Sequence, residues 1–214
     1  MPLGSVRADT VLEQRIYHLT HIRNLAGMVS ERAILAGARG VVELSPEELR
    51  AERTAVIVPG GSARPLGDYV PFFLSPDADL WQSLRAGTPH PRLSLDARQA
   101  ETTDFVFLVS TVRQVVAAGE DYVVADDNAE GVATRFATTR EDADRMLFRL
   151  RNDADAWSPR NAELLVADRF PLESVTLIGV GNDKVRAAVR EILNGSDFTP
   201  KLSVYPPWFQ PTDD

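Results

Sequence analysis

Short apolar stretches with the spacing or composition of β-strands recur along the chain. The pattern predicts strands at residues 16–21, 105–110, 122–125, 162–167 and 175–180, with a short edge strand at 202–205. The stretch 105–110 is rich in β-formers and almost wholly apolar. We therefore expect it to be a buried strand.

Segments with the periodicity of α-helices lie between these predicted strands. Ser45–Glu48 combines a serine, a proline and two acids, which is a helix N-terminus signal, and Thr139 followed by Asp142 predicts a second N-terminus. Helices are predicted from residue 24, after residue 46, and at 111–118, 138–151 and 183–193. Residues 75–103 show little periodicity and are predicted to form a loop with one helical turn at 80–84.

The mixture of strands and helices predicts an α+β fold. The chain has 214 residues, a length at which a single α+β domain is ordinary. We expect one domain over residues 9–214, preceded by a flexible N-terminus or cloning remnant at residues 1–8.

The chain contains no cysteine. This excludes a disulfide framework, a thiolate nucleophile, an iron–sulfur cluster and the cysteine-containing zinc sites. No apolar run approaches the roughly 20 residues of a transmembrane helix, so no membrane partner is expected. These features fit a protein of the reducing cytoplasm.

The formal net charge is −8, from 23 Lys+Arg against 31 Asp+Glu. An acidic total argues against a protein that coats nucleic acid through bulk positive charge. Lys184 and Lys201 are the two lysines, so almost every cation is an arginine, the side chain suited to bidentate phosphate contacts. A local nucleotide or nucleic-acid site stays open, and the alternative is the compositional bias of a GC-rich genome.

Two common nucleotide-binding motifs are missing. Neither Gly-x-x-x-x-Gly-Lys-Ser/Thr nor Gly-x-Gly-x-x-Gly occurs. His18 and His21 are three residues apart, which on a strand places them on opposite faces. No metal site is predicted.

Two polar positions stand out within predicted strands. His18 and Thr20 share one face of the first strand, and this face borders either solvent or a site. Glu163 lies between apolar neighbours, so its carboxylate must be exposed or paired. If its face holds a ligand, Glu163 is a candidate for electrostatic catalysis.

Five short motifs follow one another along the chain, and they are Ile16–Leu25, Gly67–Phe73, Phe107–Ser110, Asn161–Val166 and the closing Tyr205–Phe209. Each motif alone is short, but in this order they resemble the motifs of the DarT family, the DNA ADP-ribosyltransferase toxins that are paired with DarG macrodomain antitoxins. The similarity covers about residues 15–208.

The resemblance implies an ADP-ribosyltransferase-like fold with a central split, mainly antiparallel β-sheet flanked by helices. It also implies an enzyme that transfers ADP-ribose from NAD to thymine or guanine in single-stranded DNA and releases nicotinamide, without a metal. A DarG-like macrodomain antitoxin is the implied partner, and we expect the chain to be a monomer.

Binding and catalytic positions carry over residue by residue. The resemblance places NAD at His18, Leu19, Thr20, Gly27 and Leu35, and Tyr69 is a candidate for stacking on nicotinamide. It makes Glu163 the catalytic glutamate. The catalytic arginine matches a helix that offers Arg50 and Arg53 here, without the adjacent arginine pair typical of relatives, and the sequence does not decide between them.

The segment from about residue 122 to Glu163 matches the family's target-recognition loop. Its arginines and one aromatic suit a single strand with a splayed base, and they are Arg135, Arg140, Arg145, Arg149, Arg151, Arg160 and Trp157. A solvated helix face explains Arg145 and Arg149 equally well. Two alternatives stay open: the same chemistry on RNA or protein, and a binding module of this fold without turnover.

Overall fold

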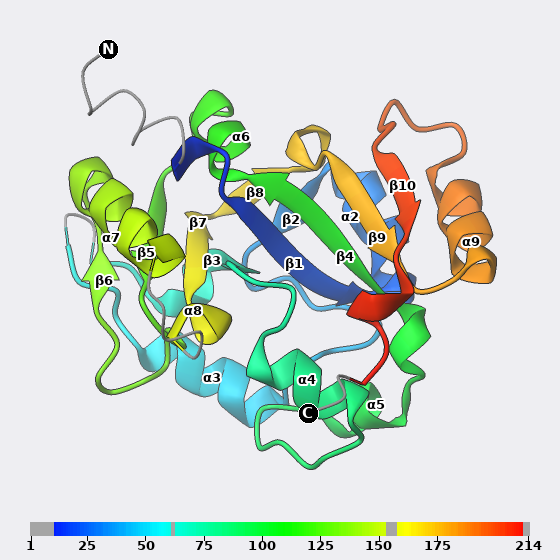
Figure 1. Ribbon diagram of the computed structural model, residues 1–214, viewed down its shortest axis with the longest axis horizontal. Helices are drawn as coiled ribbons and strands as arrows, with labels where there is room; N and C mark the ends of the chain where they lie inside the picture. The colour runs from blue at the N-terminus through cyan, green and yellow to red at the C-terminus, as the bar shows by residue number, and fades with distance from the viewer. Residues whose placement is uncertain (1–10, 61–62, 153–157, 212–214) are drawn as a thin grey trace.

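The computed structural model describes residues 11–60, 63–152 and 158–211 (Figure 1). The predicted N-terminal segment 1–8 and Trp157 lie outside these ranges. The largest element of the fold is an eight-stranded sheet of order β10-β9-β4-β1-β3-β7-β5-β6. The strands are β1 (Arg15–His21), β3 (Tyr69–Phe73), β4 (Phe105–Thr111), β5 (Tyr122–Ala125), β6 (Phe136–Ala137), β7 (Glu163–Ala167), β9 (Leu177–Val180) and β10 (Lys201–Val204).

The sheet is mainly antiparallel and divides in the middle. β1 pairs with β4 from Arg15 to His21, yet it pairs with β3 only at Tyr17 and Phe73. β10 and β9 run parallel, while the other paired strands of this sheet are antiparallel. The predicted split, mainly antiparallel sheet is confirmed.

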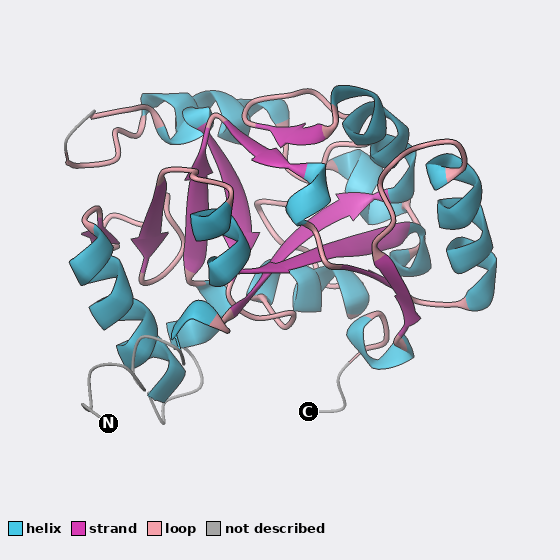
Figure 2. Cartoon of the chain, turned by 90° about the horizontal axis from the view of Figure 1, so that it is seen from above, coloured by secondary structure: helices cyan, strands magenta, loops and turns pink. Residues whose placement is uncertain are grey.

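Helices lie on both sides of the sheet (Figure 2). They are α2 (Ile22–Glu31), α3 (Glu47–Ala55), α4 (Asp79–Arg85), α5 (Leu95–Gln99), α6 (Val112–Ala117), α7 (Arg140–Asn152), α8 (Ser158–Asn161) and α9 (Asp183–Leu193). A two-stranded antiparallel sheet of β2 (Ala33–Leu35) and β8 (Arg169–Pro171), which the pattern did not predict, packs beside them. Within the described ranges, no helix is long and apolar enough to cross a bilayer.

The core occupies both faces of β4, as the uninterrupted apolar run predicts. Val106 and Leu108 join the largest buried cluster, whereas Phe105, Phe107 and Val109 join a second cluster on the other face. All five side chains are buried because successive residues of a strand point to opposite faces and both faces are covered.

The local helix signals act as the sequence predicts. The Thr139 hydroxyl accepts a hydrogen bond from the Asp142 backbone N–H and donates one to the Asp142 carboxylate, so Thr139 caps the start of α7. Thr111 caps α6 in the same way through the Gln114 N–H. The acidic pair that follows Pro46 begins α3.

The loop prediction for residues 75–103 is wrong in part, because the region contains two helices. α4 buries Leu80, Trp81 and Leu84 against the second apolar cluster. α5 begins where the Ser94 hydroxyl accepts from the Ala97 N–H. Both helices are too short for a clear period, so their stability depends on tertiary packing.

Candidate active site

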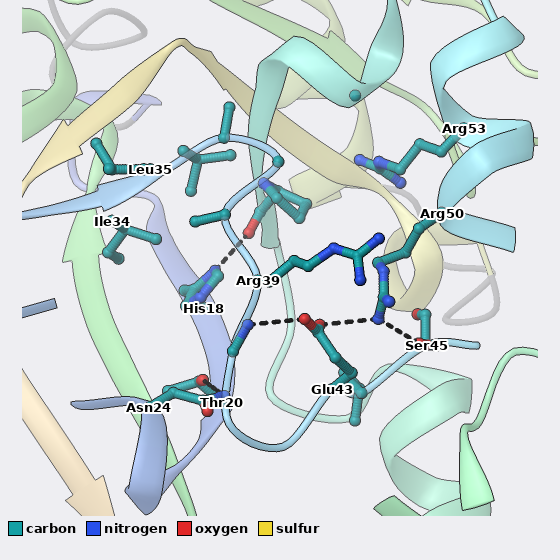
Figure 3. A pocket seen from close by; sticks show the side chains of 18 of the residues that line it. His18, Thr20, Asn24, Ile34, Leu35, Arg39, Glu43, Ser45, Arg50 and Arg53 are labelled. Atoms are coloured by element: carbon teal, nitrogen blue, oxygen red, sulfur yellow. Dashed lines mark hydrogen bonds and ion pairs between the residues drawn. The ribbon is translucent and has the colours of Figure 1, made fainter. Parts of the chain in front are cut away.

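A cavity of about 760 Å³ opens beside the split between β1 and β3 (Figure 3). Its lining includes β1, α2, β2, α3 and β3, together with Arg92, Glu130 and Glu163. Tyr17 pairs with Phe73, and Phe73 pairs in turn with Glu163 on β7, so the split begins beside the glutamate. The topology thus brings residues that are distant in sequence to one cavity.

One part of the cavity, which we name the histidine end, consists of His18, Thr20 and Asn24. The His18 Nδ1 lies 3.0 Å from the Pro71 carbonyl oxygen. A carbonyl can only accept, so Nδ1 carries the hydrogen and neutral His18 has its Nε2 as an acceptor. Burial lowers the pKa of His18 below its ordinary value, and the Pro71 hydrogen bond opposes this shift.

Asn24 ties the histidine end to the loop that follows β2. Its Nδ2 donates to the Thr20 hydroxyl at 3.1 Å and to the Val42 carbonyl at 2.8 Å, and its Oδ1 accepts from the Val42 N–H at 3.0 Å. A Cβ at Gly40 would lie 2.7 Å from Asn24 Nδ2, so this approach requires glycine. Asn24 lies in the Ile16–Leu25 motif, but the sequence alone indicates no role for it.

The remaining predicted NAD positions also border the cavity. Gly27 lies in α2, and no atom lies within 4 Å of a Cβ placed there. Leu35 is partly exposed in β2, and Tyr69 is buried at the start of β3. Leu19 differs from its neighbours, because its side chain packs into the apolar cluster that contains Trp81.

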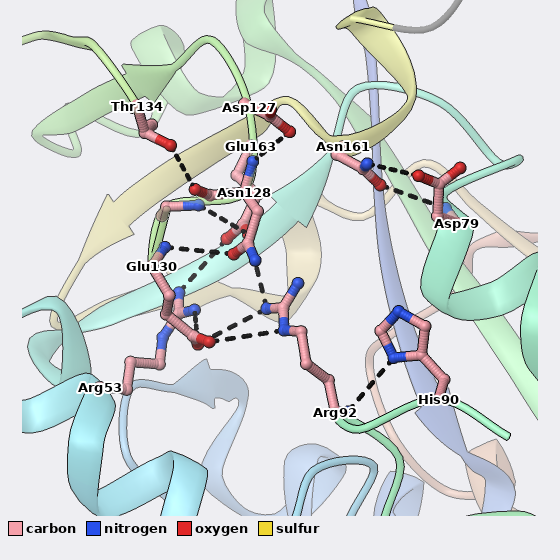
Figure 4. Close-up of polar contacts among 11 residues, drawn as sticks. Arg53, Asp79, His90, Arg92, Asp127, Asn128, Glu130, Thr134, Asn161 and Glu163 are labelled. Carbon is pink, nitrogen blue, oxygen red and sulfur yellow. Dashed lines mark hydrogen bonds and ion pairs between the residues drawn. The ribbon is translucent and has the colours of Figure 1, made fainter. Parts of the chain in front are cut away.

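The opposite part, which we name the glutamate end, consists of Glu163, Arg53, Glu130 and Arg92 (Figure 4). Only 1% of Glu163 is exposed. Its Oε2 accepts from Arg53 Nη2 at 3.3 Å, and its Oε1 accepts from the Ala129 N–H at 3.3 Å. Glu163 is therefore buried and paired, one of the two states that the sequence allows.

Glu130 and Arg92 complete the charged cluster. Glu130 Oε1 lies 3.1 Å from Arg53 Nη1, and Glu130 Oε2 lies 3.4 Å from Arg92 Nε. Arg92 Nη2 is 3.9 Å from Glu163 Oε1. Sequence reasoning missed both residues, because neither lies in a motif and both are in loops that the topology brings to β7.

Arg50 and Arg53 are separated by their contacts. Arg50 Nη1 pairs with Glu43 Oε2 at 3.0 Å and donates to the Ser45 carbonyl at 2.9 Å. Arg53 contacts Glu163 directly. Arg50 and Arg53 both line the cavity and are three residues apart in α3, but their guanidinium groups contact different partners.

The arginines of the predicted target-recognition segment lie mainly on a solvated helix face. Arg140 pairs with Asp144, Arg145 with Glu141 and Asp142, and Arg149 with Asp126, all with substantially exposed arginine side chains. These ion pairs agree with the alternative of a solvated helix face, which the sequence leaves open, and contact of the segment with single-stranded DNA stays a prediction. Arg135 is exposed, and its backbone N–H donates to Asp126.

Among the described residues, His18 and His21 do not belong to a group of metal ligands. His21 Nδ1 accepts from the Arg23 N–H at 3.2 Å and caps α2. In the part of the chain that the structure describes, no group of three or more His, Asp or Glu residues could hold a metal ion.

Comparison with known proteins places this chain in a family. The family model described as "ssDNA thymidine ADP-ribosyltransferase, DarT" matches residues 17–210. A DNA ADP-ribosyl transferase from Thermus aquaticus is 28% identical over 184 residues, covering 83% of this chain and 80% of the relative. One from Escherichia coli O127:H6 is 24% identical and covers 82% of each chain.

Solved structures share the fold. DarT from Thermus sp. 2.9 in complex with ADP-ribosylated ssDNA has a TM-score of 0.77 at 23% identity, over 92% of this chain and 96% of that one. The NAD+ complex of the same protein has a TM-score of 0.72 at 24% identity, over 92% of this chain and 98% of that one. The predictions of an NAD-dependent DNA ADP-ribosyltransferase and of NAD as co-substrate are confirmed. The chain belongs to the DarT family of ssDNA thymidine ADP-ribosyltransferases.

Proposed function

We propose that this enzyme transfers ADP-ribose from NAD to a ring nitrogen of thymine in single-stranded DNA, with Glu163 and Arg53 beside the reacting bond. The observation that carries the proposal is the Glu163–Arg53 ion pair of 3.3 Å at a cavity that also holds His18 and Thr20. The family description supports thymine over guanine, the other base considered from the sequence.

The histidine end binds NAD through neutral groups. His18 Nε2 and the Thr20 hydroxyl offer hydrogen bonds to ribose hydroxyls, and Gly27 leaves room for close approach. Arg39 lines the same cavity, and its ion pair with Glu47 is exposed. Such a pair costs little to break, so Arg39 is available to the diphosphate.

The glutamate end acts on charge that develops during the reaction. The bond between ribose C1 and the nicotinamide nitrogen breaks, and its electron pair neutralises the departing nicotinamide. The ribose then carries oxocarbenium character, which the Glu163 carboxylate stabilises because it is fixed and shielded from water. The thymine ring nitrogen forms the new bond to C1 and loses its proton to solvent.

Arg53 orients the base rather than accepting its proton. A guanidinium has no acceptor capacity and stays charged at working pH. Its donors suit a thymine carbonyl oxygen, on which negative charge grows as the ring nitrogen loses its proton. Arg50 lacks this position, because Glu43 and Ser45 hold its guanidinium.

Labelled NAD with a set of matched acceptors tests the proposal. The acceptors are a thymine-containing single-stranded oligonucleotide, its annealed duplex, a guanine-containing oligonucleotide without thymine, an RNA and a protein. We expect labelling of the first and little of the duplex, because a paired base must be extruded before it reacts. Equal labelling of single strand and duplex, or labelling of RNA or protein alone, contradicts the proposal.

We further propose that a DarG-like macrodomain antitoxin is the partner. A structure of Thermosipho africanus DarTG in complex with ADP-ribose has a TM-score of 0.67 at 13% identity, and this chain covers 51% of that one. Expression in bacteria tests the pairing. The wild-type chain should arrest growth, whereas its Glu163→Gln variant or co-expression of the macrodomain protein should restore it. Arrest that the macrodomain protein leaves unchanged contradicts the pairing.

A further inference from the structure

Arg92 is held rigidly at the edge of the active-site cavity. Its backbone N–H donates to His90 Nδ1 at 3.2 Å, and the next residue, Leu93, is 2% exposed. The Ser94 hydroxyl then begins α5. This anchored turn directs the guanidinium toward Glu130 and Glu163, as Figure 4 shows.

Glu130 satisfies two guanidinium groups at once. Its carboxylate lies within 3.5 Å of nitrogen atoms of both Arg53 and Arg92. Arg53, Arg92 and Glu130 are each more than 80% buried at the side chain. Two forked donors around one oxyanion are the arrangement with which proteins bind phosphate.

The two carboxylates of the cluster differ in how firmly they are placed. Glu163 belongs to a strand paired on both sides. Glu130 lies between β5 and β6 in a turn closed by bonds from the Gly131 N–H and the Thr134 hydroxyl to the Asn128 carbonyl, and the Ala129 N–H ties this turn to Glu163. Rotation of the Glu130 side chain alone breaks none of these backbone bonds, whereas displacement of Glu163 disturbs the sheet.

We propose that Arg92, together with Arg53, forms a phosphate-binding site for the DNA strand, and that Glu130 occupies this site when the strand is absent. The inference rests on the proposed function and adds a contact for the acceptor. A phosphodiester replaces the Glu130 carboxylate on Arg53 Nη1 and on Arg92, and Glu130 moves toward solvent. Arg53 Nη2 keeps its contact with Glu163 and stays available to the base. Glu130 thereby weakens DNA binding.

The position of the site in the cavity indicates that its phosphate belongs to the DNA rather than to NAD. Both arginines of the site contact Glu163, at the end of the cavity where the acceptor base must arrive. Arg92 and Glu130 are also supplied by segments outside the stretch of residues 18–35 that the resemblance assigns to NAD. The diphosphate of NAD is the other source of the same chemistry, and separate binding measurements distinguish the two.

The test is binding of a fluorescent thymine oligonucleotide to NAD-free protein across a range of salt, for the wild type, Glu130→Gln and Arg92→Ala. We expect Glu130→Gln to tighten binding about threefold to tenfold. Arg92→Ala should weaken it by a similar factor and make the slope of log affinity against log salt shallower by about 0.7, the value of one phosphate contact on a single strand. Glu173→Gln removes the same charge at an exposed position and should leave binding unchanged.

Binding of ADP-ribose to the same variants separates the two phosphate sources. Unchanged ADP-ribose affinity supports the DNA site, whereas a loss in Arg92→Ala confined to ADP-ribose assigns the site to NAD and overturns the inference. Weaker DNA binding by Glu130→Gln, with an unchanged melting temperature, also overturns it. Because labelled transfer by the wild-type enzyme is measured separately, the proposed function can stand when this inference fails.

Discussion

The two ends of the cavity are built in different ways. At the histidine end, His18, Thr20 and Asn24 lie within seven residues of chain and make neutral hydrogen bonds, two of them with backbone carbonyls. At the glutamate end, four charged side chains come from four segments between residues 53 and 163. The residues of the histidine end are thus close together in sequence, whereas those of the glutamate end are brought together by the topology of the sheet.

The difference matches the chemistry proposed for each end. Neutral groups that bind NAD with similar strength before and during the reaction contribute to affinity. Fixed charges that interact more strongly as an oxocarbenium ion develops contribute to rate. Substitutions at the two ends should therefore separate the KM for NAD from kcat.

Glu163→Gln should have the largest effect, a loss of about 100-fold or more in kcat. The amide keeps the volume and an acceptor for the Ala129 N–H but removes the charge that stabilises the ribose cation. Rates of labelled transfer to a thymine oligonucleotide measure the effect, and Glu163→Ala should match it. A variant that keeps more than about a tenth of the activity argues against catalysis by Glu163.

Arg53→Ala should lower kcat about 100-fold, whereas Arg50→Ala should lower it less than about tenfold. The two arginines share α3, but only Arg53 contacts Glu163, and loss of a single donor at a charged site has costs of this size. Side-by-side kinetics decide the assignment. The reverse order of effects transfers the catalytic role to Arg50, and two active variants remove arginine from the mechanism.

His18→Ala should raise the KM for NAD about tenfold and change kcat little. Loss of one hydrogen bond costs about 1 kcal/mol, close to the 1.4 kcal/mol that corresponds to a factor of ten. Steady-state kinetics with varied NAD measure the split between the two constants. A fall in kcat at unchanged KM shows instead that His18 acts in the transition state.

The smallest effect concerns the pH dependence of stability. Burial holds the pKa of His18 below the 6.5 of an unfolded histidine, so between these pKa values the unfolded chain binds more protons. Stability from neutral His18 is therefore complete above about pH 6.5 and falls as the pH drops through the folded pKa. Urea unfolding from pH 7.5 to 5.5 should show a shallower decline for His18→Ala than for the wild type.

His21 and His90 also have lowered pKa values, mainly through burial, and both remain in the two proteins. The difference between the two pH profiles therefore belongs to His18. Parallel profiles show that His18 titrates alike in the folded and unfolded chains.

Local sequence patterns were sufficient to predict the parts of the site whose residues lie close together in sequence. Strand alternation placed His18 and Thr20 on one face, and the apolar company of Glu163 indicated a paired carboxylate. The helix cap at Thr139 was predictable because its hydrogen bonds span three residues. Short helices such as α4 were not readable, since their stability comes from packing around Trp81.

The sequence by itself determined the family motifs, the strand faces and the charged residues that are candidates for catalysis, Glu163, Arg50 and Arg53. Tertiary structure alone separates Arg53 from Arg50 through its contact with Glu163, brings Arg92 and Glu130 to the same cluster, and pairs three arginines of α7 with nearby acids, namely Arg140, Arg145 and Arg149. The physical reason is that an ion pair forms where the chain brings two opposite charges within about 4 Å of each other. For residues as distant in sequence as Arg53 and Glu163, that distance is set by the order and register of the strands between them.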